Sequence, residues 1–368
     1  MDAAHARACD TRRMPSRDLI GARLRAHLLA EPAETIASAA AHMLAVQAQE
    51  FVPARWALAV RSPGSPTLAQ IDAAFESGAL VRSWTQRGTL HIVPAADLAW
   101  VLSVTAARQT RAAIGVHREW GIDSRDVDVA ERATRSALSG GNRLTRPEFA
   151  AVVAASGVDT SSSRGNHLLS ALAVRGVLAL GPLVPRAGGP TRDQYVVAAD
   201  ELDSPRVVSD PIAELFVGYV RSHGPASVAD FRWWAGMPLG MARQAADAAG
   251  DRVVEVDDGL FALRDGGEPG VAASRVHALP AFDEYYLSYA DRSGVCPLDR
   301  LPEVGPTRNG LVRPVLVAEG RVVGTWTHSL AVGRHTETPV AALWPGAGAA
   351  VAAEAGAALD AYAAFVSG

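Results

Sequence analysis

The stretch that decides the fold is RLTRPEFAAVVAASGVDTSSSRGNHLLSALAVRGVLALGP, residues 143–182. Thr145 followed three residues later by Glu148 is a capping box, which predicts that a helix begins there. Gly157 ends that helix, because glycine readily adopts the left-handed conformation at a helix C-terminus. A second helix is expected over about 164–175, followed by strands at 177–180 and 194–198 that a Pro/Gly-rich turn connects. Two helices followed by a two-stranded ribbon predict a winged helix.

The same order of elements recurs on both sides of this stretch. In residues 224–263, Ser227 and Asp230 open a first helix, Pro238 begins a second, and the wing turns at 257–259. Nearer the N-terminus, we expect a helix over 68–77. Two strands should follow it, at 80–84 and 89–93, with their turn at 86–88.

Beyond Arg275 the pattern changes to paired strands around Glu319-Gly320 and a terminal helix. The fold class expected is therefore α+β, mainly α, with three tandem winged-helix motifs and a β-rich, barrel-like C-terminal module. The predicted division of the chain is a disordered tail over 1–15, winged helices over 16–120, 121–205 and 206–272, and the C-terminal module over 273–368.

Composition limits the possible functions. The 368 residues are 49% hydrophobic, enough for a sizeable core, and the net charge of −4 argues against indiscriminate nucleic-acid binding. However, residues 1–120 carry 13 Arg against 10 acidic residues, whereas residues 241–368 carry 10 Arg against 16. A polyanion should therefore meet the N-terminal part first. The sequence contains no lysine, so no lysine amine can form a Schiff base with a sugar.

The location expected is the cytoplasm. Residues 1–16 lack the apolar segment of a secretory signal, and Met14 is an alternative start. No segment reaches the run of about 20 apolar residues that a membrane helix needs. The two cysteines, Cys9 and Cys296, cannot build a disulfide framework or a zinc site.

Common catalytic motifs are absent from the sequence. The ten histidines show no metal-binding spacing, the Gly-rich segments lack a phosphate-loop lysine, and no Gly-x-Ser-x-Gly elbow occurs. We therefore expect neither a metal nor a cofactor. From the fold alone, the alternative is a non-catalytic transcriptional regulator with its second helix in the major groove. Against it, that helix holds few base-reading side chains, namely Arg164, Asn166 and His167.

Four segments taken in order resemble the winged-helix DNA glycosylases of the AlkZ-like family, which includes an azinomycin resistance glycosylase. They are LAVQAQEFVPARWALAVR, RSWTQRGTLHIVPAADLAWVL, LPAFDEYYLSYADRS and VRPVLVAEGRVVGTWTHS. The resemblance covers the chain from about Ser16 to its C-terminus. It implies a concave DNA-binding body of three winged helices and a Gln-apolar-Gln active-site motif, which here is Gln47 and Gln49. Glutamine rather than aspartate at the second position favours the branch tied to self-resistance against natural products.

Two neutral amides are sufficient for catalysis if the substrate is already activated to lose its base. A guanine alkylated at N7 is cationic, so it leaves as a neutral base while positive charge moves to the deoxyribose. A glutamine carbonyl can stabilise that cation and hold the attacking water. We expect Gln47 and Gln49 to share this task in an extended segment, with Val46 and Ala48 packed inward. The alternative is that both glutamines are loop residues that cap a helix starting at Pro53.

The predicted substrate is double-stranded DNA carrying N7-alkylated guanine, bulky or crosslinked, and the enzyme is expected to be a monomer without lyase activity. Four further residues are candidate DNA contacts: Arg55, Arg87, His91 and Arg321. For Arg55 the alternative is an ion pair with Glu50, for Arg87 a solvated turn, and for His91 a core position. A separate group, Asp283, Glu284, Asp291 and Arg292, is expected to form an internal ion-pair network.

Overall fold

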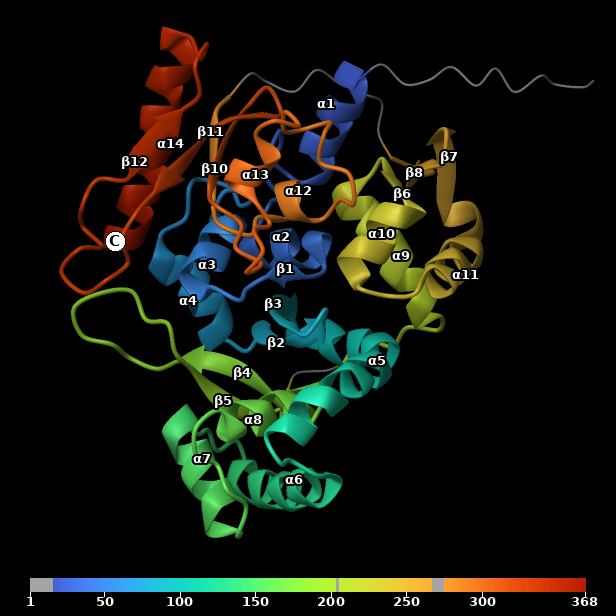
Figure 1. Ribbon diagram of the computed structural model, residues 1–368, viewed down its shortest axis with the longest axis vertical. Coiled ribbons are helices and arrows are strands. Elements are labelled where there is room, and N and C mark those ends of the chain that lie inside the picture. The colour runs from blue at the N-terminus through green and yellow to red at the C-terminus, as the bar shows by residue number, and fades with distance from the viewer. Residues whose placement is uncertain (1–15, 203–204, 267–274) are drawn as a thin grey trace, which may run out of the picture.

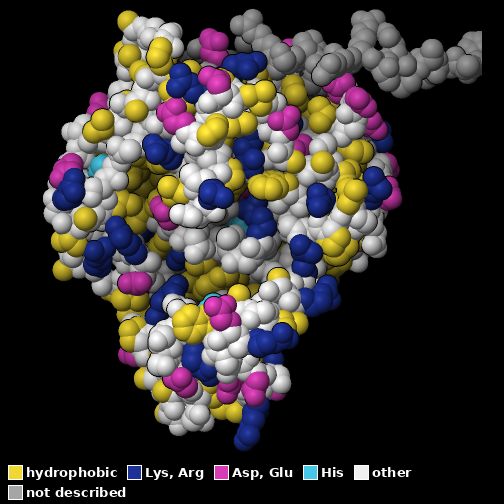
Figure 2. Space-filling model, in the orientation of Figure 1, with side chains coloured by type: hydrophobic (Ala, Val, Ile, Leu, Met, Phe, Trp, Pro, Cys, Tyr) yellow, Lys and Arg dark blue, Asp and Glu magenta, His cyan; other side chains and the backbone are white. Residues whose placement is uncertain are grey.

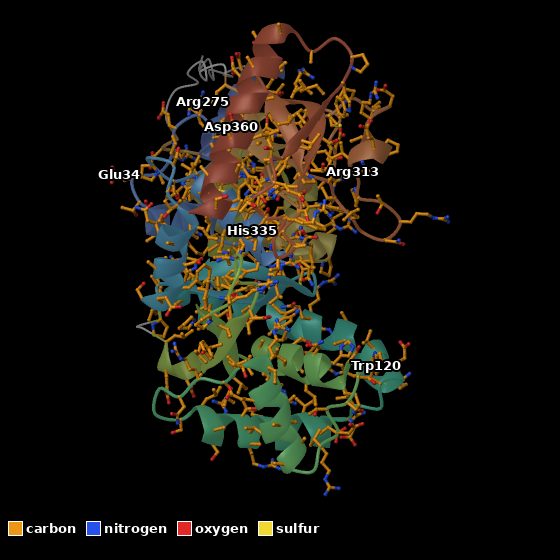
Figure 3. The ribbon with its side chains drawn as sticks, turned by 90° about the vertical axis from the view of Figure 1, so that its left-hand side faces the viewer. Glu34, Trp120, Arg275, Arg313, His335 and Asp360 are labelled. Atoms are coloured by element: carbon orange, nitrogen blue, oxygen red, sulfur yellow. The ribbon has the colours of Figure 1, made fainter. Side chains whose placement is uncertain are left out.

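A computed structural model describes residues 16–202, 205–266 and 275–368. The predicted tail over 1–15, with Cys9 and Met14, lies outside the described residues. Figure 1 shows a broad upper body and a narrower lower unit, built from α6, α7 and α8. Turned by 90°, Figure 3 shows the same two tiers, with Asp360 on the terminal helix above and Trp120 on the lower unit.

The helices of the described residues are distributed along the whole chain. They are α1 (Ser16–Ala26), α2 (Ile36–Met43), α3 (Phe51–Ala59), α4 (Leu68–Glu76), α5 (Leu98–Glu119), α6 (Ser124–Leu138), α7 (Arg146–Ala155), α8 (Arg164–Val174), α9 (Pro211–His223), α10 (Val228–Ala235), α11 (Leu239–Ala249), α12 (Glu284–Leu287), α13 (Leu301–Val304) and α14 (Ala349–Ser367).

The strands are short and form three sheets. They are β1 (Val46–Gln47), β2 (Leu80–Gln86), β3 (Thr89–Pro94), β4 (Leu178–Leu183), β5 (Gln194–Ala198), β6 (Ala226–Ser227), β7 (Val253–Asp257), β8 (Leu260–Leu263), β9 (His277–Leu279), β10 (Val315–Ala318), β11 (Arg321–Thr327) and β12 (Val340–Leu343). The sheet orders are β1-β3-β2-β4-β5, β6-β8-β7 and β12-β11-β10-β9. The fold is therefore α+β, as predicted.

The hairpins of the first two units join into one sheet, which the sequence did not predict. β2 pairs with β3 inside the first unit and also with β4 of the second, where Arg82 lies opposite Leu180. Two more predictions need correction here. Gln86 belongs to β2, so the turn is Arg87-Gly88, and α3 begins at Phe51, which puts Pro53 inside its first turn.

Local sequence signals explain the middle and third units. The Thr145 side chain accepts from the Glu148 backbone, the Glu148 side chain accepts from that of Thr145, and α7 follows as predicted. Ser227 and Asp230 form the same box at the start of α10. Gly236 ends α10 at φ +63°, a left-handed conformation that glycine adopts without strain.

The C-terminal module is an open sheet with one long helix against it. The barrel-like expectation is not met in the described residues, because β9 and β12 are edges with one neighbour each. The aromatic segment HALPAFDEYYLSYADRS, residues 277–293, contains β9 and the short α12. By length and composition α14 could cross a membrane, unlike the sequence expectation. One face of α14, including Leu359, Tyr362 and Phe365, nevertheless packs in the main core cluster.

Candidate active site

Gln47 lies on a short strand that is built into the core. β1 pairs antiparallel with β3, with Gln47 opposite His91, and the Ala48 N–H donates to the Leu90 carbonyl at 2.7 Å. Val46 and Ala48 belong to the main core cluster, as the alternating pattern predicted. The capping alternative is not supported, since Glu50 is the N-cap of α3 and makes no side-chain capping bond.

Both ends of Gln47 are held by residues distant in sequence. Its backbone N–H donates to Oε1 of Glu284 at 2.6 Å, and its side-chain Oε1 accepts from Nη2 of Arg87 at 2.7 Å. The residue is buried, with 8% of its surface exposed. Its position and its amide orientation are therefore fixed by the fold.

Gln49 is exposed, and its backbone is more firmly held than its side chain. Oε1 of Gln49 accepts from the Leu90 N–H at 3.3 Å. Buried Arg82 donates to two backbone carbonyls, those of Ala48 at 2.7 Å and Gln49 at 3.2 Å. Burial, followed by the nearby charges of Arg146 and Arg55, lowers the pKa of Arg82 to about 9. Arg82 remains a cation at neutral pH and fixes the path of the motif.

Glu284 is the site residue that sequence reasoning missed, since it was expected in an ion-pair network. Besides Gln47, its carboxylate accepts from Nε1 of Trp234 at 3.1 Å and from the Ser288 hydroxyl, and His223 Nε2 lies 3.5 Å away. Burial alone would raise the pKa of Glu284, but the hydrogen bond and charge of His223, followed by the charge of Arg87, outweigh burial and lower the pKa to about 2. A carboxylate so fully occupied serves as an anchor for Gln47.

The expected ion-pair network around Glu284 is present only in part. Asp283 forms a fully buried, two-pronged pair with Arg61, at 2.8 and 2.9 Å. Asp291 instead accepts from the Ser293 backbone, and Arg292 lies over the ring of Trp233. One feature of the sequence could have indicated buried carboxylates. The acidic pair Asp283-Glu284 stands between two aromatic residues, Phe282 and Tyr285.

The structure brings Arg87 and His91 to Gln47. Nη2 of Arg87 lies 3.4 Å from Nε2 of His91, whose Nδ1 lies 3.0 Å from the Thr89 carbonyl. Burial, and secondarily the charge of Arg87, lower the pKa of His91 to about 3, so this histidine is neutral. Arg87 therefore does not occupy a solvated wing tip, as the alternative for it supposed.

Arg55 and Arg321 are not brought to this cluster. Arg55 is fully buried and donates to Asp72 and to the Thr191 carbonyl, so neither the phosphate contact nor the Glu50 pair expected for it is supported. Arg321 is exposed at the start of β11. It lines a separate cavity of about 430 Å³ between the β10–β11 turn and the start of α14.

A larger cavity adjoins the candidate site at Arg87. It has a volume of about 630 Å³ and is lined by α5, α8, the β2–β3 turn and the segment joining α10 to α11. In the view of Figure 1, Figure 2 shows the molecule hollowed near its centre, with Arg side chains around the hollow. Among the described residues, no group of His, Cys, Asp and Glu side chains could hold a metal ion.

Comparison with known proteins identifies the family. A family model described as "DNA glycosylase AlkZ-like" matches residues 40–365. The chain belongs to the AlkZ-like DNA glycosylase family. This AlkZ-like chain is therefore an enzyme that acts on DNA.

Two relatives of the AlkZ-like chain come from Streptomyces sahachiroi. One is an interstrand DNA cross-link repair glycosylase, 26% identical over 297 residues, which are 76% of this chain and 79% of the relative. The other is the solved structure of DNA glycosylase AlkZ. It matches with a TM-score of 0.77 at 23% identity, over 97% of this chain and 98% of the AlkZ chain. The second comparison establishes the similarity of the fold.

Proposed function

We propose that this enzyme hydrolyses the N-glycosidic bond of N7-alkylated guanine in double-stranded DNA, with Gln47 and Gln49 as its catalytic residues. The observation that carries the proposal is the fixation of Gln47 between Glu284 and Arg87, at 2.6 and 2.7 Å. Catalysis by dipoles requires that they be held in place before the reaction begins. A glutamine without a catalytic role would not need two such hydrogen bonds to fix its backbone and its side chain.

The amides suffice because the alkylated base departs without being protonated. When the C1′–N9 bond breaks, the electron pair stays on N9 and neutralises the purine, while C1′ and O4′ of the sugar become an oxocarbenium ion. Between them, the two glutamines stabilise the charges that develop in this step and position the water that adds to C1′. Glu284 is not the base in this scheme, because its oxygens already accept from Gln47, Trp234 and Ser288.

We propose that the lesion is a bulky or crosslinked adduct of a DNA-alkylating natural product, and that the enzyme confers self-resistance in the cytoplasm as a monomer. The relative from Streptomyces sahachiroi, an interstrand DNA cross-link repair glycosylase, supports this assignment. The three helix–hairpin units act as tandem winged helices that bind the duplex, and exposed Arg321 contacts a phosphate.

One gel tests the function. The protein is incubated with a duplex carrying a single N7-methylguanine, and hot alkali then cleaves any abasic site. We expect strand cleavage with the wild-type protein. The Gln47→Ala and Gln49→Ala variants, if they melt and bind DNA as the wild type does, should not produce it. Duplex binding without cleavage would instead indicate the non-catalytic regulator.

A further inference from the structure

The contact between Arg87 and Gln47 determines which end of the Gln47 amide can meet a substrate. A guanidinium carries only donors, so the amide atom that faces it must be the carbonyl oxygen. The observed distance from Nη2 to Oε1 is 2.7 Å. Rotating the amide by 180° would place its NH₂ group against the guanidinium and lose this hydrogen bond.

Arg87 is itself held in this orientation. The Nδ1 of His91 lies 3.0 Å from the Thr89 carbonyl, which can only accept, so Nδ1 carries the proton and Nε2 is the acceptor. That acceptor lies 3.4 Å from Nη2 of Arg87. On its other side, the Cγ of Arg87 fills the space beside Gly236, where an added Cβ would come within 2.8 Å of it.

The amide nitrogen of Gln47 is left without a partner. The Nε2 atom of Gln47 makes no hydrogen bond to any described residue. It is also not among the buried side-chain atoms that have no hydrogen-bond partner, so it is not enclosed by the protein. The backbone of Gln47 cannot shift to use it differently, because Glu284 holds its N–H and β3 holds the strand. Gln47 therefore presents a donor to whatever enters the site.

We infer that Gln47 acts on the substrate as a hydrogen-bond donor, with Nε2 directed at N3 on the minor-groove edge of the departing guanine. This rests on the function proposed above and assigns to Gln47 a different task from stabilising the sugar cation. An oxygen that lies 2.7 Å from a guanidinium is a poor partner for a second cation. The carbonyl of Gln49, whose partner is the neutral Leu90 N–H, takes that task.

N3 is the acceptor that gains most from this donor. As the C1′–N9 bond breaks, its electron pair remains on N9, the ring atom separated from N3 by a single carbon, and electron density rises along that edge. A donor placed there stabilises the transition state more than the ground state. Water then bonds to C1′ and its proton leaves to solvent, so the step needs no other reactant.

Glutamate substitutions distinguish a donor from an acceptor. The carboxylate introduced by Gln47→Glu can still accept from Arg87 but has no N–H to offer, so we expect the single-turnover excision rate to fall by about 100-fold. Gln49→Glu strengthens the acceptor that faces the sugar cation, so it should change the rate in the opposite direction and raise it. A Gln47→Glu enzyme that is as fast as wild type would overturn the inference. Thermal melting and DNA affinity, measured for both variants, establish that they are folded and bind.

A substrate lacking the acceptor gives an independent measurement. In 7-methyl-3-deazaguanine a carbon replaces N3, so Gln47→Ala should cost little on this substrate while it slows excision of 7-methylguanine by about 100-fold. Equal losses on both substrates would refute the contact with N3. If the wild-type enzyme releases neither base, the proposed function fails and the inference falls with it.

Arg87 provides the test of orientation. Arg87→Met removes the donor that fixes the amide, so it should slow 7-methylguanine excision as Gln47→Glu does, and the double variant should be no slower than either single one. Arg308→Met, which removes an exposed arginine beyond α13 and outside the three helix–hairpin units, is the matched control. An additive double variant would show that Arg87 acts independently of Gln47, against the inference.

Discussion

The carboxylate of Glu284 accepts a hydrogen bond of 2.6 Å from the backbone N–H of Gln47, a residue 237 positions earlier in the chain. It is fully buried and also receives the indole N–H of Trp234. The strand that carries Gln47 is thus attached to the C-terminal module by an ionised group.

Removing this carboxylate should destabilise the whole protein. Glu284→Ala leaves the Gln47 N–H, the Trp234 indole and the Ser288 hydroxyl without their acceptor, so we expect a loss of about 3–5 kcal/mol in the free energy of unfolding. Urea titration measures it, and Glu34→Ala, at an exposed position, is the control. A loss below about 1 kcal/mol would show that water replaces the carboxylate.

The buried pair of Arg61 and Asp283 should show strong coupling. Each partner has no exposed surface, so Arg61→Met or Asp283→Asn alone leaves the other charge buried and should cost about 3–5 kcal/mol. The double variant removes both charges and should be clearly more stable than the sum of the two losses predicts. Additive losses in a double-mutant cycle would mean that the two groups do not interact.

Salt dependence of DNA binding should separate Arg55 from Arg321. Arg321→Ala removes an exposed cation, and if it contacts a phosphate the slope of log K against log salt should fall by about 0.9. Arg55→Met should leave the slope unchanged and lower the melting temperature, because Arg55 is buried against Asp72. The reverse pattern would place the phosphate contact at Arg55.

Acid should destabilise the protein below about pH 6.5. Burial lowers the pKa of His42 and His277 to about 4 and that of His91 to about 3, from 6.5. The unfolded chain therefore binds more protons than the folded one, and stability is lost as pH falls from 6.5 towards 4. Glu284, with its pKa lowered from 4.5 to about 2, extends the loss to lower pH. Melting temperatures across pH 8 to 4 measure this, and a constant value would contradict it.

Borohydride should trap no adduct between the enzyme and damaged DNA. A glycosylase with lyase activity forms a Schiff base through an amine, and this sequence contains no lysine. The expected product is an intact strand with an abasic site, visible only after alkali. An adduct trapped by borohydride would identify the N-terminal amine as a nucleophile.

Local signals in the sequence predicted the helices and strands well. They did not predict the contacts between segments that are distant in the chain. Thr145 with Glu148 and Ser227 with Asp230 specify helix starts within four residues, so α7 and α10 could be located directly. The pairing of β2 with β4 rests on two strands about 100 residues apart, and no local pattern encodes it.

The same limit applies to the site. Gln47 and Gln49 could be selected through the resemblance to a family with a contiguous Gln-apolar-Gln motif, and Arg87 and His91 could be added as candidate DNA contacts on the first hairpin. Glu284 reaches Gln47 only through the packing of the C-terminal module on β1, so its carboxylate looked like one more partner for an arginine. Asp283, its neighbour, has that role with Arg61.

The distance in sequence between Gln47 and Glu284 also sets the order in which the enzyme becomes competent. During synthesis the chain emerges from its N-terminus, and the N–H of Gln47 has no carboxylate to bind until residue 284 has left the ribosome. Nascent or truncated chains that end earlier contain the complete Gln-Ala-Gln motif but not the group that anchors it. A chain that ends before residue 284 is therefore expected to hold Gln47 less firmly, and to excise bases more slowly, than the full-length protein.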